Sequence, residues 1–290
     1  MSRPHLRLGR SAFSREDRVV MAIINRTPDS FYDAGRTFGD DYALAAADAA
    51  VVAGADIVDI GGVKAGPGEE VDIDEELSRT VDFVAAIRER HPDVVISVDT
   101  WRHEVGDAVC RAGADLLNDA WGGYDAELVD VAAAHGVGIV CTHTGGAAPR
   151  TRPHRVEYED VVGAVVGFLE QEASRAEAAG VRPAQILIDP GHDFGKNTRH
   201  SLAVTRELGR LVATGRPILV SLSNKDFVGE TLDEPVGRRL TGTLAATAIS
   251  SWLGAQVFRV HEVGETREVL AMAQAIAGGR PPAVARRGLA

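Results

Sequence analysis

Three cationic side chains in the last third of the chain could together bind an anion. Arg259 and His261 are separated by one residue in "FRVHEV", so an extended backbone would point both side chains the same way. Lys225 follows another apolar run, "PILVS". A guanidinium can bind two phosphate oxygens at once and an ammonium adds a mobile point charge, so these residues predict a phosphate site. The alternative is an arginine–carboxylate pair, with the neighbouring Glu262 as its acid.

Two acids and one amide at the ends of other apolar runs offer a different chemistry. Asp99 ends "VVISVD", Asn118 lies near the end of "ADLLND", and Asp189 ends "QILID". Such side chains could accept hydrogen bonds from the donor edge of an amino-substituted heterocycle. They could instead bind a divalent metal ion through oxygen, although "HEVGE" (261–265) lacks the second histidine of the zinc motif HExxH. Both alternatives stay open from the residues alone.

Eight short apolar runs alternate with longer, alanine-rich helical segments along the chain. The runs predict parallel strands covered on both faces, because their hydrophobic residues are nearly continuous. They lie at residues 19–24, 56–60, 94–99, 114–119, 137–142, 185–189, 217–221 and 256–260. Eight strands alternating with eight helices, in a chain near the roughly 250 residues typical of the fold, predict a single α/β domain, a (β/α)8 TIM barrel. A doubly wound open sheet is the rival fold, but no GxGxxG follows the first run.

A barrel would bring the polar strand ends to one mouth, because its chemistry lies at the C-terminal ends of the strands. The side chains at these ends are Asn25, Asp59, Asp99, Asn118, His143, Asp189, Lys225, Arg259 and His261. His143 fits a structural hydrogen bond as well as a site role. The cations belong to the last two strands, where barrels frequently bind phosphate, which favours the anion site over an arginine–carboxylate pair.

Composition limits the possible partners. We expect residues 18–280 to form the barrel domain, between an N-terminal extension (1–17) and a C-terminal tail (281–290) that are both poorly ordered. The formal net charge of −11 argues against nucleic acid or an anionic membrane as the main partner. The two cysteines form no CxxC pair, no apolar run is long enough to cross a bilayer, and the N-terminus lacks the apolar core of a secretory signal. We therefore expect a cytoplasmic protein.

Eight ordered motifs resemble the dihydropteroate synthase family over nearly the whole chain, from about residue 19 to residue 279. They are "MAIINRTPDSFYDAG" (21–35), "GADIVDIGG" (54–62), "ISVDT" (96–100), "LLND" (116–119), "LIDPGHDFGK" (187–196), "LSNKDFVG" (222–229), "RRLTGTLAA" (238–246) and "FRVHEV" (258–263). The resemblance implies a barrel that joins 6-hydroxymethyl-7,8-dihydropterin pyrophosphate to p-aminobenzoate, giving 7,8-dihydropteroate in folate biosynthesis. It also suggests a homodimer.

The resemblance implies roles for individual side chains. The pterin ring would bind residues matching Asp99, Asn118, Asp189 and Lys225. The pyrophosphate would bind residues matching Asn25, Arg259 and His261, with Mg²⁺ held partly by Asn25. Phe31 and Asp33 in the first loop would help to hold the aniline, and Phe194 and Lys64 complete the expected substrate contacts. The expected catalytic residues are Asp99, Lys225 and Asp33. Cations and Mg²⁺ would neutralise the charge on the departing pyrophosphate while the aniline nitrogen attacks.

The departures from the family pattern gather in the loops of the second substrate. The family's Gly-Gly-Glu-Ser-Thr-Arg-Pro-Gly is replaced after Gly62 by Val63, Lys64, Ala65 and Gly66. The usual Ser-Arg-Lys-Ser is Ser-Asn-Lys-Asp (223–226), which places Asp226 where a serine helps to hold the p-aminobenzoate carboxylate. Two like charges there would repel each other.

Other replacements add polar groups. Arg26 stands for the family's valine, and either Lys64 or Arg26 could compensate the charge of Asp226. His192 and Asp193, in "GHDFGK", stand for Ile-Gly near the expected pterin pocket.

Three functions follow. The chain is a dihydropteroate synthase with altered loops, or it is a diverged paralogue that keeps pterin-pyrophosphate binding but has weak or no synthase activity. The third is a pterin-binding barrel that transfers a methyl group from a reduced folate to a corrinoid protein. The cations Lys225, Arg259 and His261 argue against this third function, because its substrate carries no pyrophosphate.

Overall fold

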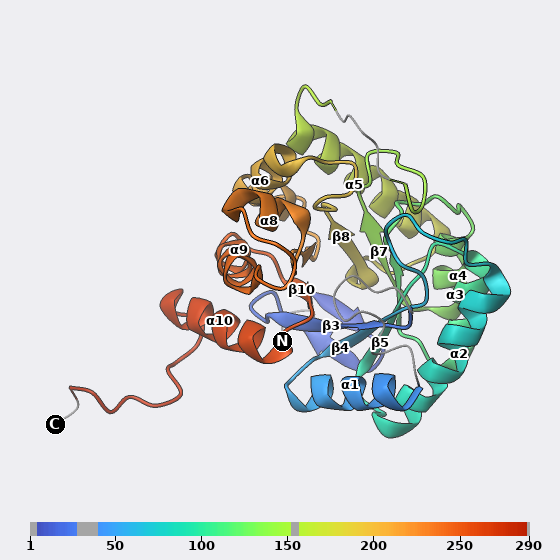
Figure 1. Ribbon diagram of the computed structural model, residues 1–290, viewed down its shortest axis with the longest axis horizontal. Helices are drawn as coiled ribbons and strands as arrows, with labels where there is room; N and C mark the ends of the chain where they lie inside the picture. Colours follow the sequence, from blue (N-terminus) through green and yellow to red (C-terminus); the bar gives the residue numbers. More distant parts are fainter. Residues whose placement is uncertain (1–4, 28–39, 152–156, 289–290) are drawn as a thin grey trace.

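The computed structural model describes residues 5–27, 40–151 and 157–288. Its centre is a sheet of eight parallel strands in the order β8-β7-β6-β5-β4-β3-β10-β9, surrounded by helices (Figure 1). A parallel bridge between Ile188 and Ile218 joins the two edges, so the barrel is nearly closed and the predicted TIM barrel is confirmed. The strands are β3 (Val19–Asn25), β4 (Ile57–Gly61), β5 (Val95–Asp99), β6 (Leu116–Asp119), β7 (Gly138–Thr142), β8 (Ile186–Asp189), β9 (Leu219–Ser221) and β10 (Val257–Val260).

The described residues contain ten α-helices, two more than predicted. The segment between β8 and β9, which the sequence count treats as one helix, divides at Glu207, whose φ of −103° and ψ of 24° depart from helical geometry. A short helix also precedes the long one after β9, and its Phe227 N donates to Asp193 Oδ2 at 3.2 Å. The helices are α1 (Asp40–Val52), α2 (Ile73–Arg90), α3 (His103–Ala112), α4 (Leu128–His135), α5 (Val161–Ala179), α6 (Thr198–Arg206), α7 (Leu208–Val212), α8 (Asp226–Leu232), α9 (Leu240–Trp252) and α10 (Val263–Ile276), with a 3₁₀ turn at Pro183–Gln185.

Helix α2 shows why these segments are helical. The Asp72 side chain caps its first turn by accepting from Glu75 N at 2.8 Å, and acids follow in that turn. Arginines stand in the last turn, where they complement the helix dipole. One face, including Phe83 and Ile87, is buried against the sheet.

The sequence led us to expect a poorly ordered N-terminal extension, but the structure shows two strands in it. Strands β1 (Leu6–Leu8) and β2 (Ser11–Phe13) form an antiparallel hairpin. Leu6 and Leu8 are fully buried in the core that the first residues of the barrel strands form, with Arg7 exposed between them. The hairpin therefore closes the N-terminal end of the barrel, opposite the mouth. In the sequence, the alternation of apolar and polar residues spans only three positions, which is too short to predict a strand.

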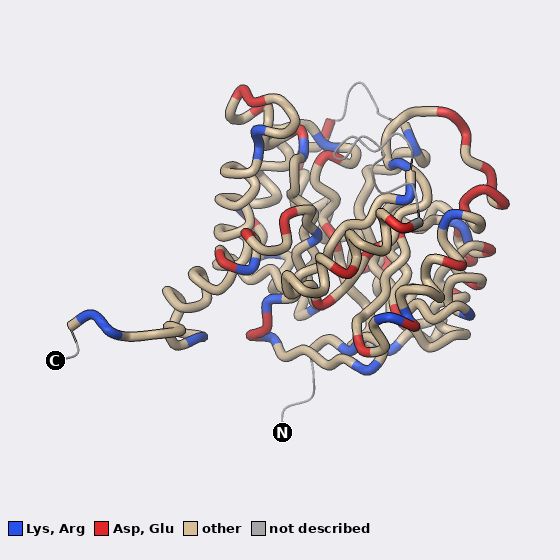
Figure 2. Tube along the Cα trace, turned by 60° about the horizontal axis from the view of Figure 1, so that its bottom comes forward, with Lys and Arg blue, Asp and Glu red and all other residues tan. Residues whose placement is uncertain are grey.

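The segment after α10 lies outside the barrel (Figure 1). Residues 281–288 are exposed and lead away from α10 (Figure 1). Acidic and basic residues are interspersed over the outer helices (Figure 2). No helix in the described ranges combines the length and the hydropathy needed to cross a membrane.

Candidate active site at the barrel mouth

Arg259 lies at the centre of the charged groups in the mouth. Its Nε donates to Oδ2 of Asp59 at 2.6 Å, and its Nη2 donates to Oδ2 of Asp99 at 2.9 Å. An arginine–carboxylate pairing is therefore present, but its acids come from β4 and β5, while Glu262 accepts from side chains that follow β9. Burial opposes the positive charge, but the two carboxylates outweigh this effect and raise the pKa of Arg259.

Neutral side chains also hold the carboxylate of Asp59. Asp59 is fully buried and accepts from Ser97 Oγ at 2.6 Å and from Asn118 Nδ2 at 3.3 Å. Burial raises the pKa of Asp99 to about 7, against the opposing effect of Arg259. Strands β5, β6 and β10 thus bring Asp99, Asn118 and Arg259 into one hydrogen-bonded cluster.

Lys225 and Asp189 lie on the other side of this cluster. Lys225 donates through Nζ to the carbonyl of His192, and Nζ lies 4.6 Å from the centre of the Phe194 ring. Burial raises the pKa of Asp189, and the charge of Lys225 opposes that rise. Burial lowers the pKa of Lys225, and the charges of Asp193 and Asp189 oppose that fall. A planar ligand here would meet acids, an amide and a cation together.

Two further predicted site residues, Asn25 and Lys64, lie at the mouth. Asn25 ends β3 in register with Gly61 of β4, so its side chain stands at the mouth next to the second loop. Lys64 lies in that loop and is half-buried. Phe31 and Asp33 lie outside the described residues.

An apolar shelf, which the sequence did not suggest, covers the mouth above β4, β5 and β6. It consists of Val63, Val71, Trp101, Ala120 and Trp121, with Phe194 packed against it. Trp121 packs edge-on against both Trp101 and Phe194, with ring centres 6.3 and 5.3 Å apart. Trp101 follows Asp99 by two residues, and Trp121 follows Asn118 by three. This spacing could have indicated that the tryptophans line the site.

Two arginine side chains hold the second loop by donating hydrogen bonds to its backbone carbonyls. Arg150, whose φ is 61°, donates to the carbonyls of Gly66 and Glu69. Arg79 donates to the carbonyl of Gly62 at 2.8 Å. Val63, at the position of the family's glutamate, is buried in the shelf.

His143 makes a structural hydrogen bond, which is one of the two roles that the sequence left open for it. Its Nδ1 lies 2.7 Å from Nζ of Lys196, which also donates to the carbonyls of His143, Gly191 and Phe194, each at 3.1 Å. Burial, helped by Lys196, lowers the pKa of His143 to about 3, so the ring is neutral. Burial lowers the pKa of Lys196 to about 7. Lys196 thus joins the loops after β7 and β8, a role that its place in "GHDFGK" did not reveal.

The replaced residues Asp226 and Arg26 each contact an arginine or a helix near them. Asp226 accepts from Nη1 of Arg239 at 3.0 Å, an arginine that the sequence had not suggested for this charge. Arg26 is buried, with its guanidinium 4.8 Å from the centre of the Phe83 ring and its Nε 3.3 Å from the carbonyl of Arg79. Arg26 therefore lies against α2.

His192 and Asp193 connect the loop after β8 to α8. His192 is fully buried, with Nε2 2.9 Å from Oγ1 of Thr205 and its ring stacked on Phe227 at 5.5 Å. Asp193, with a φ of 66°, accepts from Phe227 N and from Ser201 Oγ. These groups support the segment that carries Lys225.

His261 belongs to a separate hydrogen-bonded group in the segments that follow β9 and β10. Its Nδ1 lies 2.8 Å from Oγ of Ser223, and the same oxygen lies 3.1 Å from Oε2 of Glu262. Asn224 donates to Oε1 of Glu262 at 3.1 Å. Asn224 adopts a φ of 57°, which asparagine tolerates better than most residues.

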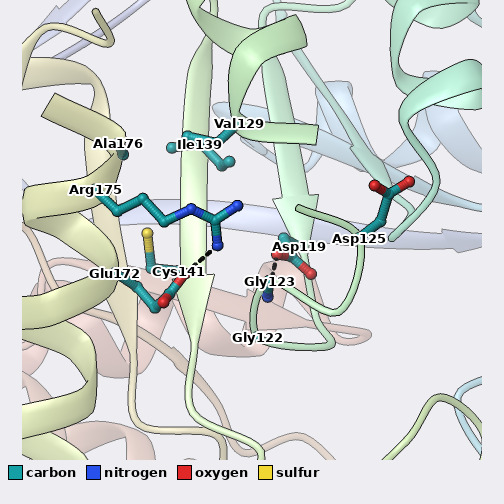
Figure 3. Close-up of a pocket in the computed structure, with 10 residues that line it drawn as sticks. All are labelled: Asp119, Gly122, Gly123, Asp125, Val129, Ile139, Cys141, Glu172, Arg175 and Ala176. Atoms are coloured by element: carbon teal, nitrogen blue, oxygen red, sulfur yellow. Dashed lines mark hydrogen bonds and ion pairs between the residues drawn. The ribbon is translucent and has the colours of Figure 1, made fainter. Parts of the chain in front are cut away.

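A small cavity of about 10 Å³ lies outside the barrel, between β6, β7 and α5 (Figure 3). Asp119 lines it and accepts from Trp121 N and Gly123 N, and burial raises the pKa of Asp119 to about 6. An ion pair of Glu172 with Arg175 at 3.3 Å lines the opposite side. A space of this size holds about one water molecule and no pterin.

The barrel and its cluster of acids, amide and cations define a pterin-binding protein, and comparisons with known proteins agree. The family model described as "Pterin binding enzyme" matches residues 21–261. The chain is 56% identical to "Inactive dihydropteroate synthase 2" of Mycobacterium tuberculosis over 276 residues, which cover 94% of this chain and 87% of that protein. It is 37% identical to the dihydropteroate synthase of Synechocystis over 277 residues, covering 94% and 95%.

Solved structures give the same result. Dihydropteroate synthase of Yersinia pestis, in a sulfonamide complex, superposes with a TM-score of 0.90 at 35% identity and covers 95% of this chain and 100% of that one. The Xanthomonas albilineans enzyme with 4-aminobenzoic acid superposes with a TM-score of 0.86 at 34% identity, covering 98% and 100%. The chain belongs to the dihydropteroate synthase family. Membership fits the synthase and the diverged paralogue alike.

Proposed function

We propose that this protein is a diverged paralogue of dihydropteroate synthase that binds a pterin pyrophosphate at the barrel mouth and has weak or no synthase activity with p-aminobenzoate. The observation that carries this proposal is the contrast between the two halves of the mouth. Asp59 and Arg259 join Asn118 and Asp99 by hydrogen bonds, and the charges of Asp189 and Lys225 act on each other and on Arg259. The loops for the second substrate carry an acid and an apolar side chain in place of the family's polar groups.

The pterin half offers complementary groups. Buried carboxylates and an amide oxygen can accept from the amino and ring N–H groups of a pterin, and Lys225 can donate to its oxygen. The two acids on Arg259 hold the guanidinium in place before a ligand arrives, which reduces the cost of ordering it.

The acceptor half lacks what a benzoate needs. Asp226, next to Lys225, forms an ion pair with Arg239. A substrate carboxylate at this position would lie close to the carboxylate of Asp226, and the two like charges would repel each other. Val63 is buried among tryptophans where the family carries an acid. Support also comes from the mycobacterial relatives, which are named as inactive.

The synthase function remains the second candidate, favoured by the identity to synthases of Synechocystis and Escherichia coli. It would use the same cluster, with Lys225 and Arg259 stabilising the charge of the departing pyrophosphate.

Mg²⁺ fits the mouth through Asn25. Magnesium prefers one or two protein oxygens together with phosphate oxygens and water, and the amide oxygen of Asn25 stands at the end of β3. Bound there with the diphosphate, the ion would neutralise phosphate charge. We also propose a cytoplasmic homodimer, since Cys110 and Cys141 are free thiols and α9 and α10 expose large apolar side chains.

Calorimetry with 6-hydroxymethyl-7,8-dihydropterin pyrophosphate and Mg²⁺ tests the binding half of the proposal. We expect saturable binding that Arg259→Lys weakens at least tenfold, because lysine cannot replace the paired contacts of the guanidinium. Arg238→Lys, an exposed neighbour of Arg239, is the matched control and should leave the affinity unchanged. Absence of binding to the unchanged protein would contradict the proposal.

A pyrophosphate-release assay with p-aminobenzoate tests the catalytic half. We expect little or no turnover by the unchanged protein and a gain in the double variant Lys64→Ser/Asp226→Ser, which restores the family's serines. Turnover by the unchanged protein at a rate typical of enzymes, about 1 per second or faster, would favour the synthase instead.

A further inference from the structure

Four side chains after β9 and β10 share a limited number of protons. Oγ of Ser223 lies 2.8 Å from Nδ1 of His261 and 3.1 Å from Oε2 of Glu262. The backbone N–H of His261 and Nδ2 of Asn224 also point at Oγ, each at 3.4 Å. Ser223 and Asn224 are buried, at 4% and 2% exposure, so these bonds are shielded from water.

The hydrogen-bond donors and acceptors in this group indicate which ring nitrogen of His261 carries the proton. An ionised carboxylate only accepts, so the single hydroxyl proton of Ser223 is directed to Glu262. The short contact between Oγ and His261 then requires the ring to donate from Nδ1. A neutral His261 therefore carries its proton on Nδ1, and Nε2 is an acceptor. A phosphate oxygen is also an acceptor, so it cannot bind Nε2 in that form.

We propose that Glu262 is a positioning residue that acts through the Ser223 hydroxyl to keep the proton of neutral His261 on Nδ1, so that the ring takes up a second proton when a diphosphate binds. One proton moves from the buffer to Nε2, and no other bond forms or breaks. The inference rests on the proposed function, because the diphosphate that His261 would contact is part of the ligand proposed there. Glu262 then stabilises the imidazolium through the hydroxyl that joins them.

Other charges at this end of the barrel have partners of their own. Arg259 on β10 is held by Asp59 and Asp99. Lys225, before α8, donates to the carbonyl of His192, and Asp226 at the start of α8 pairs with Arg239, before α9. None of these pairs involves the Ser223–Glu262 connection, which contacts Nδ1 of His261.

The variant Glu262→Gln should reverse the direction of this connection. Asn224 donates to the position of Oε1, so it favours the amide oxygen of the new side chain there. The amide nitrogen would then occupy the position of Oε2 and donate to Ser223. The hydroxyl proton would turn to Nδ1, and neutral His261 would carry its proton on Nε2, ready to donate to phosphate without proton uptake.

Calorimetry in two buffers of different ionisation enthalpy measures that proton. The titrant is 6-hydroxymethyl-7,8-dihydropterin pyrophosphate with Mg²⁺, at about pH 7.5, above the ordinary histidine pKa of about 6.5. We expect the unchanged protein to take up more protons than Glu262→Gln, by up to about one, since one ring nitrogen titrates. Glu265→Gln, an exposed acid on α10, is the matched control and should behave like the unchanged protein. Equal proton uptake by the unchanged protein and Glu262→Gln would overturn the inference.

Nitrogen NMR of the unliganded protein gives a test that needs neither the variant nor the ligand. The ¹⁵N signals of the His261 ring, identified by their loss in His261→Gln, should show a protonated Nδ1 and an unprotonated Nε2 above the ring pKa. A protonated Nε2 with a bare Nδ1 would overturn the inference even if Glu262→Gln fails to fold. Failure of the pterin pyrophosphate to bind would overturn the proposed function instead, and the ring signals would still decide the inference.

Discussion

At the scale of single residues, the mouth depends on charges that balance one another inside the barrel. Arg259 is the cation between two acids, of which Asp59 is fully buried. A buried ion pair is weak evidence for stability as a whole, but removing one partner leaves the other uncompensated. The same contacts that prepare Arg259 for a ligand therefore make it structurally necessary.

We expect Arg259→Ala to lower the free energy of unfolding by about 3–5 kcal/mol at neutral pH, because the acids lose their buried cation. The loss should shrink at acidic pH, where Asp99, whose pKa burial raises to about 7, takes up a proton. Denaturant unfolding at two pH values measures both effects. A loss that does not change with pH would show that packing, and not charge, is responsible. Arg238→Ala, exposed at the surface, is the control.

His143 predicts a second dependence on pH. Its folded pKa of about 3 lies below the unfolded value of 6.5, because the ring is buried beside Lys196. A depressed pKa gives stability that is present above the unfolded value and is lost as pH falls towards the folded value. We expect the unchanged protein to lose stability between pH 6.5 and pH 3 relative to His143→Gln, which carries no titratable group. Parallel pH profiles of the free energy of unfolding would contradict this.

At the scale of elements, sequence patterns predicted the strands, and the polar residues at the strand ends predicted which side chains would stand at the mouth. Long alternation of apolar and helical segments fixes the order of a barrel, and polar strand ends then must meet. The partners of those ends could not be read from the sequence. Arg259 with Asp59, and Asp226 with Arg239, are joined by rotamers and by strands far apart in the chain. The tryptophan shelf and the Lys196 contacts likewise depend on how neighbouring loops pack.

The N-terminal hairpin is an element that the sequence did not predict. It should contribute much of the stability at the N-terminal end of the barrel. Leu8 is fully buried, so Leu8→Ala should lower the free energy of unfolding by about 2–5 kcal/mol through lost contacts and a cavity. Arg7→Ala, the exposed residue between Leu6 and Leu8, should change it by less than about 0.5 kcal/mol. Equal effects of both substitutions in urea unfolding would show that the hairpin does not seal the barrel.

At the scale of the whole molecule, one outer surface is unusually apolar. Helices α9 and α10 pack against each other and expose Ile249, Trp252, Met272 and Ile276 by 55–64%. Burying large apolar side chains gains about 1.5–3 kcal/mol each, so a second copy that covers this surface would stabilise both molecules. The barrel mouth lies at the strand ends, away from the middle of these helices, so each copy would keep its own complete site.

We expect the protein to sediment as a dimer at micromolar concentration, and Trp252→Asp to convert it to a monomer, because the dimer would bury an unpaired charge. Tyr42→Asp places the same charge on an aromatic residue of α1 that is 74% exposed, and it should leave the dimer intact. Sedimentation velocity distinguishes the two species by mass. Pterin-pyrophosphate affinity should be equal in the dimer and in the Trp252→Asp monomer, since the mouth lies at the strand ends, away from the exposed faces of α9 and α10. A monomeric unchanged protein would contradict the assembly, and weaker binding by the monomer would show that the partner supports the mouth.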